Sequence, residues 1–206
     1  MISTWPCHSL AEVSDSIASG LAFRRRRTGG EPTPVINVAD LRDGSLAPGD
    51  GLSTALLDRG ASVDRYRVRE GDILVTSRGT QLRVARVESE SVGAVASSNL
   101  IIVRPGPALA APLVFALLRS PWGQAQLLSR SRSSSAAIAL TAKDVGALTV
   151  PVPPVELQQQ LADLVETAER VHAAATAAAD LRRTVAREVV IAWLKGAVES
   201  QLHDRK

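Results

Sequence analysis

The 206-residue chain contains a single cysteine, Cys7. One cysteine cannot form an internal disulfide, and a metal site built on thiolates is not expected from it. The first residues show no charged region followed by an apolar core, and the apolar run at 109–118 is too short to cross a bilayer. These features predict a cytoplasmic protein that has no membrane-spanning segment.

The sequence also lacks the motifs of common enzymes. It has neither of the glycine motifs that cradle phosphates, and no Gly-x-Ser-x-Gly nucleophile motif. The histidines are far apart, and none has a cysteine or carboxylate at metal-ligand spacing: His8, His172 and His203. A metal-dependent nuclease needs carboxylates near a lysine, yet the only lysine before Lys195 is Lys143, with no acid two positions ahead of it. We therefore expect no catalytic residue, no metal ion and no cofactor in this chain.

Positive charge is concentrated in the first part of the chain. Residues 1–150 carry 17 basic and 13 acidic side chains, whereas residues 151–206 carry 7 and 8. Nearly all the basic residues are arginine, which pairs in a bidentate manner with phosphate and with guanine edges. GC-rich coding produces the same arginine bias, so the bias alone is weak support for a nucleic-acid partner.

Two short stretches are rich in arginine. The first is the run at 24–27, which repels itself and must be a solvated loop. The second is residues 129–135, in which serines surround Arg130 and Arg132. Such loops bind phosphates and base edges in some proteins and are plain solvated loops in others, so both interpretations are open.

The pattern of residues 1–150 predicts a small, mostly β domain. Short apolar or alternating segments separated by turns are typical of strands, and they occur at 34–41, 65–69, 73–76, 82–87, 92–96 and 99–103, with turns at 42–44 and 70–72. Residues 110–128 have helical spacing with an interruption at Ser120 and Pro121, and a short helix is expected at Thr141. Residues 52–66 are ambiguous and are expected to be partly helical. Trp5 is interpreted as a buried anchor.

Residues 151–206 predict one long helix. Pro151, Pro153 and Pro154 prevent a helix ahead of them, but Pro154 suits a first turn. Apolar residues then step by four and three, as in a coiled coil, before the phase changes at Leu181, Val185 and Val189. Residues 155–194 contain no proline or glycine and as a helix would span ~60 Å, so we expect this helix to pack on a second long helix from another chain. The seam residues expected at this dimer or partner interface are Leu157, Leu161, Leu164, Ala168 and Val171.

Four segments of the sequence are informative in combination: Trp5, residues 71–75 (GDILV) with Arg78 and Gly79, residues 117–124 (LLRSPWGQ) and residues 148–161 (LTVPVPPVELQQQL). Together they resemble half of a type I restriction-modification DNA specificity subunit. The resemblance implies an α+β fold: a target recognition domain at 1–150 that reads double-stranded DNA, followed by a helix at 151–206. It also implies a non-catalytic subunit that directs an adenine methyltransferase, and in some systems a translocating nuclease, as part of a defence complex.

Members of that family commonly carry two recognition domains and two helices, whereas this sequence has one of each. We therefore expect a homodimer that recognises a symmetric, split site. The candidates for DNA contact come from side-chain chemistry, with Arg78 and Gln81 expected to read bases. They are Arg24, Arg25, Arg26, Arg27, Arg78, Gln81, Arg83, Arg130 and Arg132. Two alternatives are a coiled-coil adaptor that does not bind DNA, and a nuclease with an unrecognised site.

Overall fold

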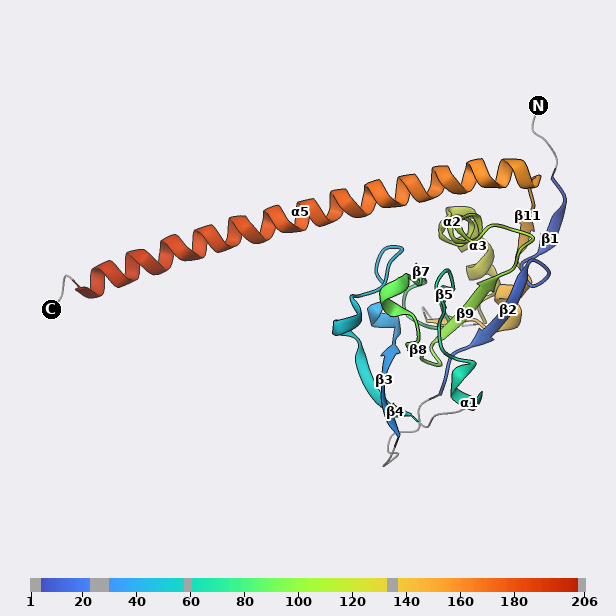
Figure 1. Cartoon of the computed structure of the whole chain (residues 1–206), viewed down its shortest axis with the longest axis horizontal. Coiled ribbons are helices and arrows are strands. Elements are labelled where there is room, and N and C mark those ends of the chain that lie inside the picture. Colours follow the sequence, from blue (N-terminus) through green and yellow to red (C-terminus); the bar gives the residue numbers. More distant parts are fainter. Residues whose placement is uncertain (1–4, 23–29, 58–60, 133–136, 204–206) are drawn as a thin grey trace. The chain divides into compact units, whose positions relative to one another are not determined.

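The computed structural model of the chain describes residues 5–22, 30–57, 61–132 and 137–203 (Figure 1). The chain forms two compact units, Met1–Ala162 and Asp163–Lys206. The strands of the described chain all lie in the first unit, and the second unit contains most of one long helix. The fold is therefore the predicted α+β arrangement, a small mixed domain followed by a long helix.

A four-stranded antiparallel sheet forms the centre of the first unit. Its strand order is β2 (Ser14–Ser19), β9 (Leu100–Pro105), β5 (Ile73–Thr76) and β7 (Val84–Arg86). Successive side chains of a strand point to opposite faces, and here both faces are covered. Ile73 and Ile101 belong to one buried cluster, whereas Leu74 and Ile102 belong to another. This explains why all four residues of β5 are buried.

A second sheet contains β4 (Ser53–Leu57), β3 (Glu31–Ile36) and β8 (Val95–Ala96). β3 pairs antiparallel with β4 and parallel with β8. The 3₁₀ turns η1 (Val38–Asp40), η2 (Gly49–Gly51) and η3 (Ser89–Ser91) lie in the connecting segments. Residues 52–66 contain β4 and then the short helix α1 (Ala61–Asp64), so the segment is only partly helical, as expected.

Two helices, α2 (Ala111–Arg119) and α3 (Pro121–Arg130), pack against the central sheet and confirm the predicted break at Ser120. The Ser120 hydroxyl accepts a hydrogen bond from the Gly123 amide at 3.0 Å, which caps α3. A Cβ at Gly123 would lie 2.0 Å from the Leu117 carbonyl oxygen, so the tight turn between the helices requires glycine here.

Short elements connect the two ends of the first unit. β6 (Arg78–Gly79) pairs with β10 (Ile138–Ala139), and β1 (Cys7–Ser9) pairs with β11 (Thr149–Pro151). The short helix α4 (Ala142–Gly146) starts at Thr141, as predicted. Trp5 is half-buried, so it is less enclosed than the expected anchor.

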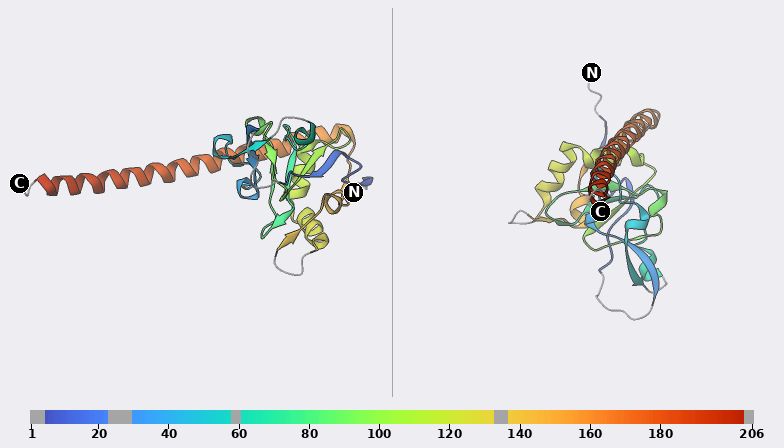
Figure 2. Two further views of the ribbon diagram at one scale, coloured as in Figure 1. Left: turned by 90° about the horizontal axis from the view of Figure 1, so that it is seen from below. Right: turned by 90° about the vertical axis from the view of Figure 1, so that its left-hand side faces the viewer.

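The last helix, α5 (Val155–His203), starts directly after Pro154 and is unbroken (Figure 2). Gln158 fixes its first turn to the first unit: its side-chain oxygen accepts from the Ala110 amide, and its nitrogen donates to the Ala108 and Pro153 carbonyls, at 2.9–3.0 Å. Gln158 and Ala162 are buried, whereas the side chains described beyond them are mostly exposed. None of the helices in the described ranges is long and apolar enough to cross a membrane.

Candidate nucleic-acid interface

The structure brings two of the predicted DNA-contact segments together. Arg78 in β6 lies opposite Ala139 in β10, and the Arg132 amide donates to the Ala139 carbonyl at 3.2 Å. Residues 138–140 therefore run between the Arg78 and Arg132 segments, which places these segments about two strand spacings, roughly 10 Å, apart. Both arginine side chains are exposed. The pairing joins segments that are some 50 residues apart in the sequence.

Arg78 and Gln81 present different kinds of polar group on the β6–β7 connection. The Arg78 guanidinium makes no hydrogen bond or ion pair within the described part of the chain. The Gln81 side-chain oxygen accepts from Arg83 at 3.0 Å, and Arg83 also donates to the Leu41 carbonyl at 2.8 Å. Arg83 thus fixes the orientation of the Gln81 amide, which keeps its NH₂ group as a donor.

Arg130 and Arg132 bind groups of the protein itself. The Arg130 guanidinium donates to the carbonyls of Gln126 and Ala147, at 3.0 and 3.2 Å, and so joins the ends of α3 and α4. Arg132 pairs with Asp144 at 3.4 Å. Hydrogen bonds from Thr141, and secondarily from Arg132, lower the pKa of Asp144. The predicted Arg24, Arg25, Arg26 and Arg27 lie outside the described residues.

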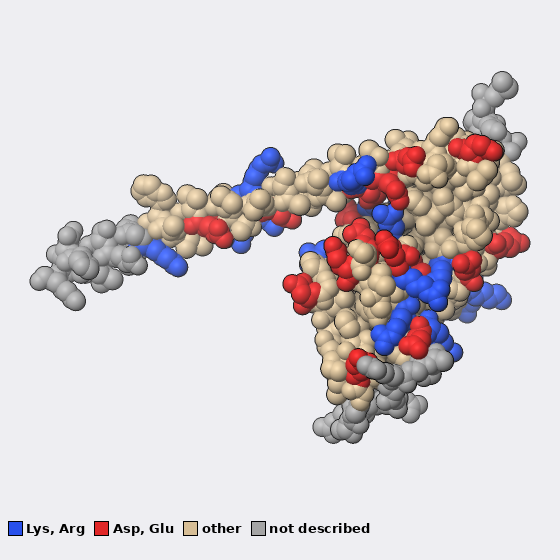
Figure 3. Space-filling model, viewed as in Figure 1, with Lys and Arg blue, Asp and Glu red and all other residues tan. Residues whose placement is uncertain are grey.

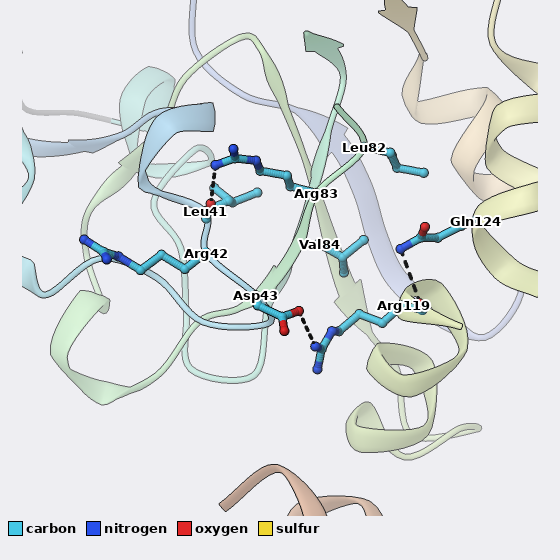
Figure 4. A pocket seen from close by; sticks show the side chains of 8 residues that line it. All are labelled: Leu41, Arg42, Asp43, Leu82, Arg83, Val84, Arg119 and Gln124. Carbon is cyan, nitrogen blue, oxygen red and sulfur yellow. Dashed lines mark hydrogen bonds and ion pairs between the residues drawn. The ribbon is translucent and has the colours of Figure 1, made fainter. Parts of the chain in front are cut away.

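A pocket of about 330 Å³, here named the arginine pocket, lies beside Arg83 (Figure 4). It lies between the loop after η1, the start of β7, the end of α2 and the first turn of α3. Its lining residues are Leu41, Arg42, Asp43, Leu82, Arg83, Val84, Arg119 and Gln124. Arg119 donates to the Asp43 carboxylate at 2.6 Å. Three guanidiniums and one carboxylate therefore line this pocket.

Sequence reasoning missed Arg42 and Arg119 as candidate site residues. Residues 42–44 have the composition of a turn, and Arg119 belongs to a segment with helical spacing that also carries the family resemblance, so neither arginine stands out as a DNA contact. No local signal places positions 42, 83 and 119 together, because their proximity depends on the packing of loop, strand and helix. The Arg119 guanidinium also lies 5.2 Å from the centroid of the Phe115 ring, a cation–π contact that holds it at the end of α2.

The Gly-Asp turn ahead of β5 has a role in folding. Gly71 has φ +81°, a conformation that favours glycine. Asp72 is 1% exposed; its carboxylate accepts from the Arg69 amide at 2.8 Å and from two nitrogens of Arg104 at 2.8 and 2.7 Å. The hydrogen bonds between Arg104 and Asp72 raise the pKa of Arg104 above its ordinary value. The turn is therefore joined to β9 by a buried bidentate ion pair.

Charges of both signs lie on the face of the first unit seen in Figure 3, with basic side chains gathered towards its right-hand part. Every second residue from Arg65 to Arg69 is an arginine, and the contacts of these side chains differ. Arg65 lies over the Tyr66 ring at 4.6 Å, and Arg67 pairs with Asp64 at 3.1 Å.

Among the described residues, no three histidine, cysteine or acidic side chains are placed to hold a metal ion.

The predicted seam of α5 is solvent-accessible in a single chain. Leu157 and Leu161 are half-buried, Ala168 is exposed, and Leu164 and Val171 are 66% and 63% exposed. Counted through Arg182, in place of the phase change expected at Leu181, the four-three stepping continues with Val185, Val189 and Ala192, and α5 is continuous through this region. A single arginine thus interrupts an apolar seam that spans most of the helix.

A small mixed domain joined to one long helix is the fold of half of a type I restriction-modification specificity subunit, as the sequence resemblance implied. The chain is similar to the HsdS subunit from Thermoanaerobacter tengcongensis, with 22% identity, a TM-score of 0.59, and coverage of 84% of this chain and 44% of that chain. It is similar to the type I S subunit from M. genitalium, with 17% identity, a TM-score of 0.51, and coverage of 82% and 40%.

The chain is also similar to a structure that describes complex assembly and conformational transition of the type I R-M system. The identity is 20%, the TM-score is 0.58, and the match covers 84% of this chain and 40% of that chain. The chain therefore spans less than half the length of these structures. No family model matches the sequence, and no curated protein does.

Proposed function

We propose that this chain is a sequence-specific DNA-recognition subunit of a type I-like restriction-modification or related defence complex. The main support is the specificity-subunit fold, which extends over 84% of the chain. On that fold, Arg78 and Gln81 lie on one exposed connection, and the arginine pocket lies next to it. Arginine can bind guanine and glutamine can bind adenine through two hydrogen bonds each, so this connection has the chemistry for base readout.

In this proposal the chain carries no catalytic activity of its own. A partner methyltransferase binds S-adenosylmethionine and modifies adenine, and a restriction or translocase subunit completes some assemblies. The similarity to a structure described in terms of type I R-M complex assembly supports such partners. The specificity subunit then decides which duplex the partner modifies.

We further infer that two copies associate through α5. A four-three apolar seam on an exposed helix of this length needs a second helix to cover it. The chain matches less than half of each similar specificity subunit, so a second copy would supply the second recognition domain and helix. A two-fold dimer of this kind would recognise a symmetric site split by a spacer.

Binding of the purified chain to a mixed-sequence duplex at increasing salt tests the proposal. Because each neutralised phosphate releases counterions, the logarithm of the affinity should fall linearly with the logarithm of salt concentration. The full chain should then select a defined sequence from a random duplex library. Absence of binding at low salt would favour the adaptor alternative, and cleavage of plasmid by the pure protein with magnesium would favour the nuclease alternative.

A further inference from the structure

The arginine pocket has an excess of positive charge inside a concave surface. Arg42, Arg83 and Arg119 contribute three guanidiniums, and Asp43 contributes the one carboxylate among the lining residues. The Asp43 side chain is 78% exposed, whereas the Arg119 side chain is 21% exposed. The single carboxylate is therefore well solvated, and the three cations of the lining outnumber it. The pocket as a whole is suited to an anion.

The backbone around Arg42 is rigid. Leu41 is fully buried, its carbonyl accepts from Arg83, and the Gly44 carbonyl accepts from the Arg86 amide at 3.0 Å. Gly44 has φ +85°, and a Cβ there would lie 2.7 Å from a terminal nitrogen of Arg119. The loop thus approaches β7 and α2 closely and depends on a glycine to do so. The backbone of Arg42 on such a loop is positioned before any ligand arrives.

Arg42 is the guanidinium with capacity to bind a ligand. Its side chain is exposed, and it makes no hydrogen bond or ion pair within the described ranges. Arg83, by contrast, donates to Leu41 and Gln81, and Arg119 donates to Asp43. Figure 4 shows the Arg42 and Arg83 side chains, from different elements, extending towards the same side of the view, with the Arg42 guanidinium pointing away from Arg119 and Gln124. Arg42 can therefore add donors at the edge of the pocket, on the side of Arg83.

We propose that the arginine pocket binds a backbone phosphate of the DNA duplex, beside the bases that Arg78 and Gln81 contact; this inference rests on the proposed function. Arg83 connects the two parts, because it lines the pocket and also holds the Gln81 side chain. The volume of about 330 Å³ is roughly ten times the ~30 Å³ share of one water, so a phosphate and part of its sugar fit. Phosphate contacts of this kind fix the register of a protein on DNA.

The test measures binding of the full-length chain to a fluorescent mixed-sequence duplex as salt is varied. Arg42→Ala should reduce the salt dependence by about 0.9 in slope, the value for one lost phosphate contact. Arg170→Ala, an exposed arginine of α5, is the matched control for the loss of one positive charge and should keep the wild-type slope. Arg42 has no described side-chain partner, so its replacement should leave the thermal unfolding temperature unchanged.

The outcomes separate this inference from the proposed function. If the wild type binds no DNA at low salt, the proposed function fails. If the wild type binds and Arg42→Ala has the same slope as Arg170→Ala, the pocket is not a phosphate contact and the inference is wrong. A further measurement is the thermal stability of the wild type with added inorganic phosphate at constant ionic strength. If phosphate stabilises the wild type but Arg42→Ala keeps the wild-type salt slope for DNA binding, the pocket is a small-anion site only, and the inference is wrong.

Discussion

Among the described residues, Asp72 is the only acidic or basic one that is buried. It is 1% exposed and forms a bidentate pair with Arg104, whose side chain is 18% exposed. Asp72→Ala leaves that guanidinium partly buried without its partner, so we expect a loss of about 3–5 kcal/mol in the free energy of unfolding. Asp64→Ala breaks a more exposed pair with Arg67 and should cost about 0–1 kcal/mol. Urea unfolding of both variants checks this, and equal losses would contradict it.

Asp144 gives the stability of the first unit a pH dependence. Its hydrogen bonds with Thr141 lower its pKa, so its ionised form is stabilised in the folded state. This stabilisation is complete above the ordinary aspartate pKa of about 3.9 and is lost as pH falls through the lowered value. Asp144→Asn should therefore cost about 0.3–1 kcal/mol at pH 7, and the difference from the wild type should shrink towards pH 3. Urea unfolding at both pH values measures it; a constant difference would exclude this carboxylate as the cause.

At single residues, the sequence predicted local roles but not long-range partners. The turn at 70–72 was expected because glycine and aspartate mark turns, yet nothing near it indicates that Asp72 pairs with Arg104. Similarly, Arg78, Gln81 and Arg83 were chosen for their chemistry and Arg42 and Arg119 were not, although Arg42, Arg83 and Arg119 line one pocket. Local spacing carries the first kind of information, and tertiary packing carries the second.

At the scale of elements, the break between α2 and α3, the start of α4 and the start of α5 were predicted from capping and proline rules. These signals are local and physical: a hydroxyl that caps a helix and a proline that suits a first turn. The pairing of β6 with β10 was not predicted, because two-residue strands have no period to detect. Gln158 is the first of three consecutive glutamines, and only the structure shows that it is buried while the other two are exposed.

Arg182 is the residue that limits the α5 seam. It occupies a seam position between Ala178 and Val185, where an apolar residue would continue the stepping. If two α5 helices pack together, Arg182→Leu should stabilise the dimer by about 1.5–3 kcal/mol per buried leucine. Concentration-dependent thermal unfolding followed by circular dichroism measures this. Arg183→Leu, which lies off the seam, is the control and should not stabilise the dimer; a gain as large as that of Arg182→Leu would argue against the seam.

For the whole molecule, the oligomeric state should depend on the seam near the start of α5. Replacing Leu161 and Leu164 by glutamate places like charges in the proposed interface, so we expect a monomer at micromolar concentration in sedimentation experiments. The first unit should remain folded, because Leu164 is 66% exposed and Leu161 is half-buried in the single chain. Ala173→Glu with Ala177→Glu adds the same charge on the opposite face and should leave the dimer intact. An unchanged oligomer in the leucine variant would rule out this interface.

The same dimer predicts how DNA binding depends on the spacer within a split site. Two recognition domains joined by a pair of α5 helices can reach both half-sites only at one separation. Each inserted base pair rotates one half-site by about 34° and moves it by about 3.4 Å. We therefore expect a single optimal spacer, with affinity falling by about 10²–10⁴ on either side as binding reduces to one half-site. Fluorescence anisotropy on a series of selected sites with altered spacers measures this dependence. The glutamate variant of Leu161 and Leu164 should bind every spacer equally weakly, since a monomer reads one half-site; a wild-type dimer indifferent to the spacer would exclude α5 as the element that sets the distance.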